Sequence, residues 1–451
     1  MKIIVIGSGK VGRTIIEHIC KEGHQVIVID NDAKEIENLI NKYDIMGICG
    51  NGANYDILQS AGASRADLVI ASTSSDEINI LACLISKQLG ADATIARVRN
   101  YEYNNQIEKM KNAFGITMTI NPELETAKEI SNIINFPEAI RVDSFANGNV
   151  DIVELFIPED SPLIGHNLAS IFTKYQIKIL VCAVQRNEEV FIPTGNFTFK
   201  AKDRIHITQE RAIVKQFLSK LGLIQNKIHD ILIIGGGKIT VYLGEMLLKQ
   251  GYNVKIIEQK YDRCVELSEL LPKASIICGD GSDQEVLEEE GLNSCDCIVS
   301  LTNLDEENII ISMYAHKKEV FKIITKVNKP SFAGLLETIG VASVVSPKDI
   351  TASKIISYVR AKNNTHGSNI ITLYKLVNNQ VEALEFIANK NSKVLNKCLK
   401  DLKLKNNVLV ASIIRNGRVI IPSGADFIAQ NDRVIVVTAG QILDDLNDIL
   451  G

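Results

Sequence analysis

Three glycines near the start of the chain have the spacing of a phosphate-binding loop. Gly7, Gly9 and Gly12 follow the apolar run KIIVI and open a helical pattern. In a G-x-G-x-x-G of this kind the first glycine allows a tight turn, the second lets backbone N–H groups approach a pyrophosphate, and the third lets helix and strand pack closely. The helix N-terminus adds positive potential. The sequence therefore predicts a nucleotide site that includes Gly7, Ser8, Gly9, Lys10, Val11 and Gly12.

An acidic residue follows at the position expected for a ribose contact. Asp30 ends the next apolar run, QVIVI, 18 residues after Gly12. A carboxylate there can accept hydrogen bonds from ribose hydroxyls and would repel a 2′-phosphate. The prediction is NAD or an adenosine nucleotide rather than NADP.

Polar residues also follow the fourth and fifth predicted strands. Thr73 and Ser74 come at the carboxyl edge of the sheet, where they could donate hydrogen bonds to a nucleotide or cap the next helix. Arg97 ends the fifth strand, where it could hold a phosphate or carboxylate or be a surface cation. Lys10 could likewise contact a phosphate, or it could be a solvated lysine of the loop.

The chain matches itself at an offset of 228 to 231 positions. Asp30 recurs as Glu258, and the motif from Ile192 to Gly195 recurs from Ile421 to Gly424. The period is too long for a solenoid repeat and indicates a duplicated two-domain unit. The second predicted nucleotide site comprises Gly235, Gly236, Gly237, Lys238, Ile239, Glu258, Asp280, Thr302, Asn303 and Lys326. Its third glycine is replaced by Thr240, whose β-branched side chain is expected to crowd helix against strand.

Short β-rich runs alternate with helical patterns in the first part of each copy, which predicts a parallel, doubly wound sheet. The fold class is therefore α/β: two tandem copies of a Rossmann-like domain, each followed by a small α/β module. The expected domains are residues 1–122, 140–223, 229–347 and 367–451. Helices beginning at Pro122 and Pro347 are expected to end the Rossmann domains, and the stretch from Gly222 to Asp230 to link the two copies.

Composition narrows the possible functions. A net charge of -5 argues against a broad basic surface for nucleic acid or an anionic membrane. No apolar run approaches the roughly 20 residues of a membrane span, and the first residues lack a secretory core, so we expect a cytoplasmic protein. The nine cysteines are scattered, and only Cys295 and Cys297 lie close together, which favours reduced thiols over disulfides or zinc.

These features resemble the TrkA family, the peripheral regulatory subunits of bacterial Trk potassium uptake systems. The resemblance rests on MKIIVIGSGKVG, Asp30, CGNGAN, ASTSSDEIN, the IARVR run and the tandem duplication, and it covers essentially the whole chain. In that family each half is a regulator-of-potassium-conductance (RCK) unit. The resemblance implies that NAD or NADH binds, with ATP and ADP as ligands of some members. It also implies a homo-oligomer, a dimer or tetramer, on a membrane-embedded potassium-translocating subunit.

The resemblance also assigns site residues. By position, the nucleotide contacts it implies are Gly7 to Val11, Asp30, Ala53, Thr73, Ser74 and Arg97. The chain departs from the family pattern at Asn51, where related units often carry aspartate or another polar group, and at Thr240.

The rival interpretation is an NAD-dependent oxidoreductase, because the same loop serves hydride-transfer enzymes. Tyr314 and Lys318, with Ser300 upstream, superficially match a dehydrogenase catalytic set. They follow the fourth strand of the second copy, lack the appropriate glycine spacing, and correspond to an ordinary helix in the first copy. The seven histidines form no metal-binding pattern. We therefore expect a regulator with no catalytic residues and no metal site.

Overall fold

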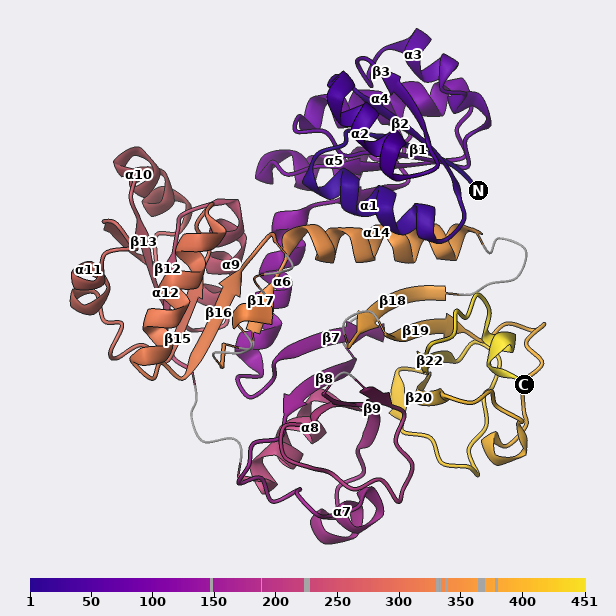
Figure 1. Cartoon of the computed structure of the whole chain (residues 1–451), viewed down its shortest axis with the longest axis vertical. Helices are drawn as coiled ribbons and strands as arrows, with labels where there is room; N and C mark the ends of the chain where they lie inside the picture. Colours follow the sequence, from indigo (N-terminus) through magenta and orange to yellow (C-terminus); the bar gives the residue numbers. More distant parts are fainter. Residues whose placement is uncertain are drawn as a thin grey trace. The chain divides into compact units, whose positions relative to one another are not determined.

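The computed structural model describes residues 1–451 except 147–148, 188, 223–227, 330–331, 333, 337–339, 342, 364–369 and 378–379. The chain forms two compact units (Figure 1). Unit 1 contains Met1–Thr126 and Ser346–Val359, and unit 2 contains Ala127–Val345 and Arg360–Gly451. Most of the expected link between the copies lies outside the described residues.

The first Rossmann domain has a six-stranded parallel sheet in the order β3-β2-β1-β4-β5-β6. Its strands are β1 (Lys2–Ile6), β2 (Gln25–Asp30), β3 (Met46–Cys49), β4 (Leu68–Ala71), β5 (Ala93–Arg97) and β6 (Met118–Ile120). Its helices are α1 (Lys10–Lys21), α2 (Ala33–Lys42), α3 (Tyr55–Ser60), η1 (Ala63–Arg65), α4 (Asp76–Leu89) and α5 (Tyr101–Met110). The strand order reverses between β1 and β4, the place where open α/β sheets bind ligands.

Strand alternation builds a core on each face of this sheet. Ile3 and Val5 of β1 join one buried cluster, which includes the apolar side of α1. Ile4 and Ile6 join the opposite cluster, with residues of α3 and α4. Successive side chains of a strand point to opposite faces, so a continuously apolar strand such as β1 must be covered on both.

The second Rossmann domain repeats this design, in the order β14-β13-β12-β15-β16-β17. Its strands are β12 (Asp230–Ile234), β13 (Asn253–Glu258), β14 (Ser275–Cys278), β15 (Cys297–Ser300), β16 (Lys322–Lys326) and β17 (Ser343–Val345). Its helices include α9 (Lys238–Lys249), α10 (Tyr261–Leu270), α11 (Gln284–Glu289) and α12 (Asp305–Lys317).

Two helices are divided between the units in a way the sequence does not predict. In α14 (Pro347–Asn363), Ile355, Ile356 and Val359 are buried in the core of the first Rossmann domain beside α1, although the helix follows the second domain. In α6 (Pro122–Asn135), residues from Ala127 onward belong to unit 2. There Asn135 accepts a hydrogen bond from the Tyr252 hydroxyl at 3.0 Å. The expectation that each helix ends the Rossmann domain it follows is therefore wrong for α14 and for α6 from Ala127 onward.

Each small module is a five-stranded antiparallel sheet, in the orders β10-β9-β11-β8-β7 and β18-β19-β22-β20-β21. The first contains β7 (Arg141–Phe145), β8 (Val150–Phe156), α7 (Leu168–Tyr175), β9 (Leu180–Arg186), β10 (Glu189–Phe191), β11 (Arg204–Gln209) and α8 (Arg211–Lys220). The second contains β18 (Ile370–Leu376), β19 (Val381–Ile387), η3 (Leu399–Asp401), β20 (Val408–Arg415), β21 (Arg418–Ile420), β22 (Arg433–Ala439) and η4 (Leu446–Ile449).

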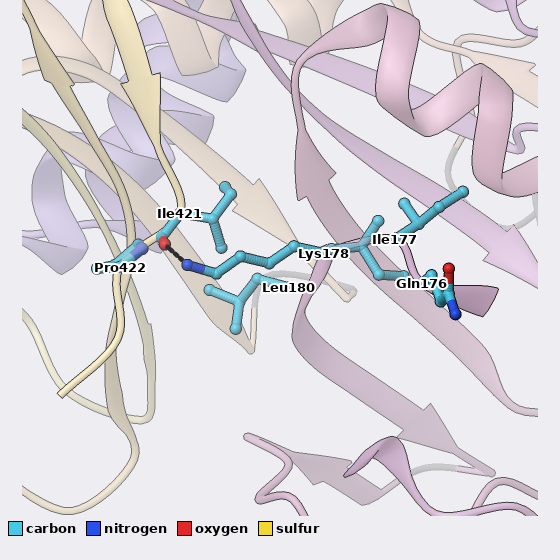
Figure 2. Close-up of a pocket in the computed structure, with 7 residues that line it drawn as sticks. Gln176, Ile177, Lys178, Leu180, Ile421 and Pro422 are labelled. Carbon is cyan, nitrogen blue, oxygen red and sulfur yellow. Dashed lines mark hydrogen bonds between the residues drawn. The ribbon is translucent and has the colours of Figure 1, made fainter. Parts of the chain in front are cut away.

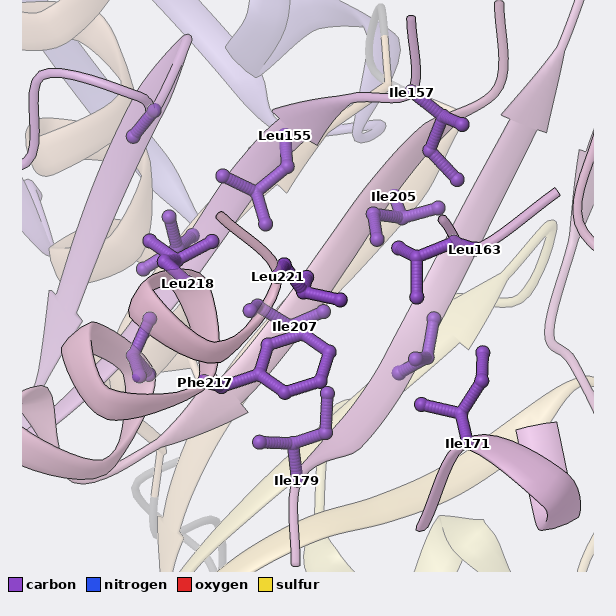
Figure 3. Close-up of a cluster of buried hydrophobic side chains, with 14 of the residues drawn as sticks. Leu155, Ile157, Leu163, Ile171, Ile179, Ile205, Ile207, Phe217, Leu218 and Leu221 are labelled. Atoms are coloured by element: carbon purple, nitrogen blue, oxygen red, sulfur yellow. The ribbon is translucent and has the colours of Figure 1, made fainter. Parts of the chain in front are cut away.

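The modules have their own cores and share a third one. In the first module, Phe217 and Leu218 of α8 pack with Ile207 of β11 (Figure 3). The shared cluster combines β8 and β9 of the first module with β19 and β22 of the second. Phe145 meets Tyr374 edge to face, with ring centroids 4.8 Å apart. The predicted fold class, tandem Rossmann-like domains each with a small module, is confirmed.

Candidate functional site

The first glycine loop connects β1 to α1, and close packing explains two of its glycines. Gly7 has a φ of 91°, and a Cβ atom added there would lie 2.8 Å from the backbone nitrogen of Thr73. A Cβ atom on Gly12 would lie 2.0 Å from the carbonyl oxygen of Gly7. A Cβ atom on Gly9 would meet nothing within 4 Å. Close packing therefore requires glycine at Gly7 and Gly12, whereas Gly9 borders open space.

The N-terminus of α1 is available to an anion. Asp32, Asn54 and Ser75 cap α2, α3 and α4 with their side chains, whereas α1 begins at Gly9 with no side-chain cap among the described residues. In the second copy α9 likewise begins at Gly237 without one. The first N–H groups of a helix lack intrahelical partners and carry positive partial charge. Both loops therefore offer donors for phosphate oxygens.

Asp30 is bound to the loop it faces. Its Oδ2 accepts hydrogen bonds from the N–H and the hydroxyl of Ser8, both at 2.6 Å, and its Oδ1 accepts from the Asp32 N–H at 3.0 Å. Burial acts to raise the pKa of Asp30, but these hydrogen bonds outweigh it and hold the pKa below its ordinary value. Asp30 is therefore a carboxylate at the end of β2, beside the loop, as the sequence predicts.

Glu258 has the same place in the second copy. Its Oε2 accepts from the N–H of Gly236 at 2.7 Å, and its Oε1 accepts from the N–H of Lys260 at 2.9 Å. Thr240 takes the place of the third glycine. Its side chain is fully buried, and its hydroxyl donates to the carbonyl oxygen of Gly235. The buried hydroxyl of Thr240 is thus paired with the loop.

Each loop is also held by an arginine that the sequence does not single out. Arg13 of α1 donates from Nε to the carbonyl oxygen of Ser8 at 3.0 Å and pairs with Glu35 of α2. In the second copy Arg263 of α10, at the position equivalent to Glu35, donates to the carbonyl oxygen of Gly236 at 2.6 Å. The two copies hold the loop with a cation from different helices. Comparison of the two copies in the sequence would show only that they carry different residues at the positions of Arg13 and Arg263.

Lys10 and Lys238 are exposed at the first position of their helices, and Val11 and Ile239 are buried behind them.

The polar residues after β4 and β15 are organised by a buried asparagine in each copy. Asn79 accepts a hydrogen bond from the Thr73 N–H at 2.8 Å and donates to the carbonyl oxygens of Thr73 and Arg97. Asn308 makes the same bonds to Thr302 and Lys326. Each asparagine ties the ends of two adjacent strands together. These asparagines were not among the site residues predicted from the sequence, although their recurrence at equivalent positions of the two copies could have identified them.

The exposed side chains beside these threonines have no comparable role. Ser74 and Asn303 are exposed, and Ser75, rather than Thr73 or Ser74, caps α4.

Arg97 and Lys326 are not surface cations. The Nη1 atom of Arg97 lies 3.4 Å from the carbonyl oxygens of Ser72 and Thr73, and its buried Nε has no partner among the described residues. Burial and the neighbouring Arg99 lower the pKa of Arg97. Lys326 is 7% exposed and its Nζ lies 3.5 Å from the carbonyl oxygen of Leu301. Both cations lie at the carboxyl edge of their sheets, near the loops.

The turns after β3 and β14 differ between the copies. Asn51 accepts a hydrogen bond from the Ala53 N–H at 3.0 Å. Asp280 accepts from both the N–H and the hydroxyl of Ser282, at 2.9 and 2.7 Å, and from Gln259. The hydroxyl of Ser282 is the main reason that the pKa of Asp280 is lowered. The second turn is therefore the more negative of the two.

The dehydrogenase-like residues do not form a set. Tyr314 and Lys318 both bind Glu288 of α11, the lysine at 2.6 Å. Ser300 is fully buried and shares a hydrogen bond with Ser312 at 3.3 Å. The Tyr314 hydroxyl therefore interacts with a carboxylate of the helical layer rather than with Ser300.

A separate pocket of about 380 Å³ lies between the small modules (Figure 2). Lys178 crosses from the first module and donates from Nζ to the carbonyl oxygen of Ile421 at 2.5 Å. The pocket is lined by Gln176, Ile177, Lys178, Ile179, Leu180, Ile421 and Pro422. Among the described residues, no helix is long and apolar enough to cross a membrane, and no three or more metal-ligating side chains gather as a metal site.

Comparison with protein families gives two matches in each copy. The TrkA-N domain matches residues 3–122 and 231–347, and the TrkA-C domain matches residues 152–222 and 383–451.

Full-length relatives are also found. The chain is 31% identical to the Trk system potassium uptake protein TrkA homolog 1 of Methanosarcina mazei over 97% of either chain. It is 30% identical to the Trk system potassium uptake protein TrkA of Vibrio alginolyticus, covering 97% of this chain and 95% of that one.

Solved structures share the fold. A GsuK channel bound to NAD has a TM-score of 0.64 at 16% identity, covering 97% of this chain and 77% of that chain. A crystal structure of the GsuK RCK domain has a TM-score of 0.63, covering 97% and 92%.

Proposed function

The chain belongs to the TrkA family, and from this membership we propose that it is a nucleotide-sensing regulatory subunit of a potassium uptake system. It binds NAD or NADH, or ATP or ADP, and gates a membrane-embedded potassium-translocating partner. It is a regulator rather than an enzyme. It is cytoplasmic and reaches the inner face of the membrane by docking on that partner.

The observation that carries the proposal is the uncapped N-terminus of α1 beside Asp30. Phosphate oxygens would bind the backbone N–H groups from Gly9 to Val11, and ribose hydroxyls would bind Asp30. Arg97, whose buried Nε has no partner among the described residues, offers a nearby cation. The remaining proposed contacts are Gly7, Ser8, Lys10, Gly12, Ala53, Thr73 and Ser74. When bound, the nucleotide supplies phosphate charge and ribose hydroxyls for these residues to recognise.

We propose a second site in the second Rossmann domain. Its α9 also begins without a side-chain cap among the described residues, and Glu258 contacts the loop as Asp30 does. The proposed contacts are Gly235, Gly236, Gly237, Lys238, Ile239, Glu258, Asp280, Thr302, Asn303 and Lys326. The GsuK structures support nucleotide binding by this fold, since one is bound to NAD and another to ADP. The proposed domains remain residues 1–122, 140–223, 229–347 and 367–451.

Regulation requires that the nucleotide bind one arrangement of the protein better than another. Helix α14 is suited to transmit such a difference. Its residues up to Val359 belong to the core of unit 1, whereas Arg360 belongs to unit 2, where it pairs with Glu382 of β19 at 2.8 Å. Helix α14 therefore contributes residues to both units.

The subunit is proposed to form a homo-oligomer, a dimer or tetramer. One chain supplies two similar but inequivalent RCK units, so a symmetric assembly presents four or eight of them and can close into a ring. Movements of the individual units then add at the perimeter of the ring, where the partner docks.

The test combines binding, size and flux. NAD, NADH, ATP and ADP are titrated calorimetrically against the purified protein, and light scattering measures its mass. Potassium flux is then measured with the reconstituted partner at varied nucleotide. We expect saturable binding, an oligomeric mass and nucleotide-dependent flux. A monomer that binds no nucleotide and leaves flux unchanged contradicts the proposal.

A further inference from the structure

Two cysteines of the second Rossmann domain contact the same short stretch of backbone beside Glu258. Cys264 lies in the first turns of α10, with its Sγ 3.2 Å from the carbonyl oxygen of Glu258. Cys278 ends β14, and its Sγ lies 3.8 Å from the carbonyl oxygen of Gln259. The strand register pairs Cys278 directly with Glu258. Both thiols therefore lie at the residue proposed to bind ribose.

The two thiols also lie close to each other. Burial raises the pKa of Cys264 to about 11, and the neighbouring Cys278 thiol raises it further. Cys264 is only 7% exposed, and its Sγ also lies 3.9 Å from the carbonyl oxygen of Ile277, the residue before Cys278. Cys278 is exposed. One thiol is thus open to reagents in solution, and the other is held beside it.

The first copy contains half of this arrangement and serves as an internal control. Cys49 is equivalent to Cys278: it ends β3, is exposed, and has its Sγ 3.5 Å from the carbonyl oxygen of Asn31. The position equivalent to Cys264 is occupied by Ile36, which is buried. An oxidant that reacts with Cys49 finds no second thiol there.

We propose that Cys264 and Cys278 are a reversible disulfide site that is oxidised by low-molecular-weight disulfides. The Cys278 thiolate attacks one sulfur of the small disulfide, forms a mixed disulfide and releases one small thiol. Cys264 then loses its proton and attacks the Cys278 sulfur, which releases the second small thiol. The two protein thiols lose two electrons and two protons, and the small disulfide gains them as two thiols. The high pKa of the Cys264 thiol makes the second step faster as the pH rises.

The disulfide should weaken nucleotide binding at the second site, an effect that rests on the proposed function. Joining the sulfur atoms at bonding distance draws the first turns of α10 toward β14. Arg263, the neighbour of Cys264, would move with them, and it donates to the carbonyl oxygen of Gly236 in the loop. Oxidation also removes the thiol hydrogen from the bond to the Glu258 carbonyl oxygen. Formation of the disulfide therefore disturbs the positions that Arg263 and Glu258 have in the reduced protein.

The linkage is tested on the full-length protein with glutathione disulfide. After incubation and digestion, mass spectrometry is expected to find the Cys264 and Cys278 peptides joined, with the loss of two hydrogen atoms, and to find Cys49 only as a glutathione adduct. Dithiothreitol should reverse both. In Cys264→Ser, Cys278 should retain glutathione as Cys49 does, and Cys49→Ser should leave the linkage intact. A stable glutathione adduct on Cys278 of the unsubstituted protein would overturn the proposal.

The functional arm uses the Asp30→Ala background, so that NAD binding reports mainly the second site. Oxidation is expected to raise the Kd for NAD at least threefold, and the same treatment of the Cys278→Ser variant, which lacks the exposed thiol at this site, to leave it within twofold. An unchanged Kd in protein shown to carry the linkage would refute the regulatory role. If reduced protein binds no NAD at this site, the proposed function fails there, while the peptide linkage still decides whether the disulfide forms.

Discussion

Ser8 donates two hydrogen bonds to one carboxylate oxygen of Asp30, from its N–H and from its hydroxyl, both 2.6 Å long. The other oxygen accepts from the Asp32 N–H. Since an ionised carboxylate has about four acceptor positions, the protein itself fills most of them. In the second copy Gly236 has no hydroxyl, so Glu258 accepts only one bond from the loop. The two acids thus differ in the number of positions left for ribose hydroxyls.

Replacing Ser8 by alanine is expected to tighten NAD binding at the first site. The substitution removes the hydroxyl and keeps the N–H, which frees one acceptor position on Asp30. A net hydrogen bond contributes about 0.5 to 1.5 kcal/mol, so the Kd should fall by roughly two- to tenfold. Calorimetry on Ser8→Ala and the unsubstituted protein measures this. A weaker complex would show that the hydroxyl acts mainly by orienting the carboxylate.

The reverse effect is expected for Asp30→Ala, which should weaken NAD or ATP binding at the first site by about 1.5 to 3 kcal/mol. This variant should also be less stable, because the N–H of the buried Ser8 loses its hydrogen-bond acceptor. Asp30→Asn keeps an acceptor oxygen and should recover stability but not full affinity. An Asp30→Ala variant with an unchanged isotherm contradicts the ribose assignment.

The pH dependence of the Asp30 contribution follows from its pKa, which is lower in the folded than in the unfolded protein. Its stabilisation is complete above the unfolded value near 3.8 and is lost as the pH falls through the folded value.

The glycine pattern and strand spacing were sufficient to locate the loops and both acids, because backbone geometry restricts which residues fit there. Gly12, for example, has no room for a Cβ atom beside Gly7. The sequence could not identify Arg13 and Arg263, since they approach the loops from different helices. It also could not show that Cys264 and Cys278 lie beside the same stretch of backbone, because the packing of α10 on β14 places them there.

Buried Asn79 and Asn308 are expected to be required for stability in their own domains. Asn79→Ala leaves the N–H of Thr73 and the carbonyl oxygen of Arg97 without their partner, and each unsatisfied buried group costs about 1 to 3 kcal/mol. Hydrogen exchange should show greater opening in the first Rossmann domain of Asn79→Ala and in the second of Asn308→Ala. Equal protection from hydrogen exchange in both variants and in the unsubstituted protein would show that these asparagines do not hold the strand ends together.

No oxidoreductase turnover is expected with NADH and keto acids, aldehydes or quinones. The Tyr314 hydroxyl and Lys318 both bind Glu288, while Ser300 bonds to Ser312. Proton-transfer groups must lie within hydrogen-bond reach of the same substrate. In this arrangement Tyr314, Lys318 and Ser300 do not converge on one position. Absorbance at the NADH band measures turnover, with Tyr314→Phe as the control. Sustained NADH oxidation that Tyr314→Phe abolishes would support the oxidoreductase alternative.

The division of α6 and α14 between the units was also beyond the sequence. Each helix carries an apolar side that can cover the α1 or α9 face of a Rossmann domain, and the duplication makes those faces similar. Ile355 and Val359 of α14 are buried with Ile15 and Ile19 of α1. Hydrophobic periodicity shows that such a helix must be covered, but it does not identify the domain that covers it.

Lys322 of β16 provides a prediction for alkaline pH. Its ammonium group donates to the carbonyl oxygens of Pro137 and Ala139, at 2.9 and 2.6 Å, and so fastens the chain after α6 to the second Rossmann domain. Burial lowers its pKa to about 8, against smaller opposing effects of Cys297 and Glu138. The first copy has Ala93 at this position, so the attachment is specific to the second.

A lysine whose pKa is lower in the folded than in the unfolded state favours folding more as the pH rises between the two values. From about pH 8 to the ordinary value of 10.5, the unfolded chain holds the proton that the folded protein has released. The free energy of unfolding, relative to Lys322→Met, should therefore increase from pH 7.5 to pH 9.5, since other titrating groups largely cancel in the comparison. Urea unfolding of both proteins at the two pH values measures the difference. A difference that shrinks over this range would mean that the ammonium form of Lys322 is stabilised by its carbonyl contacts more than burial penalises it.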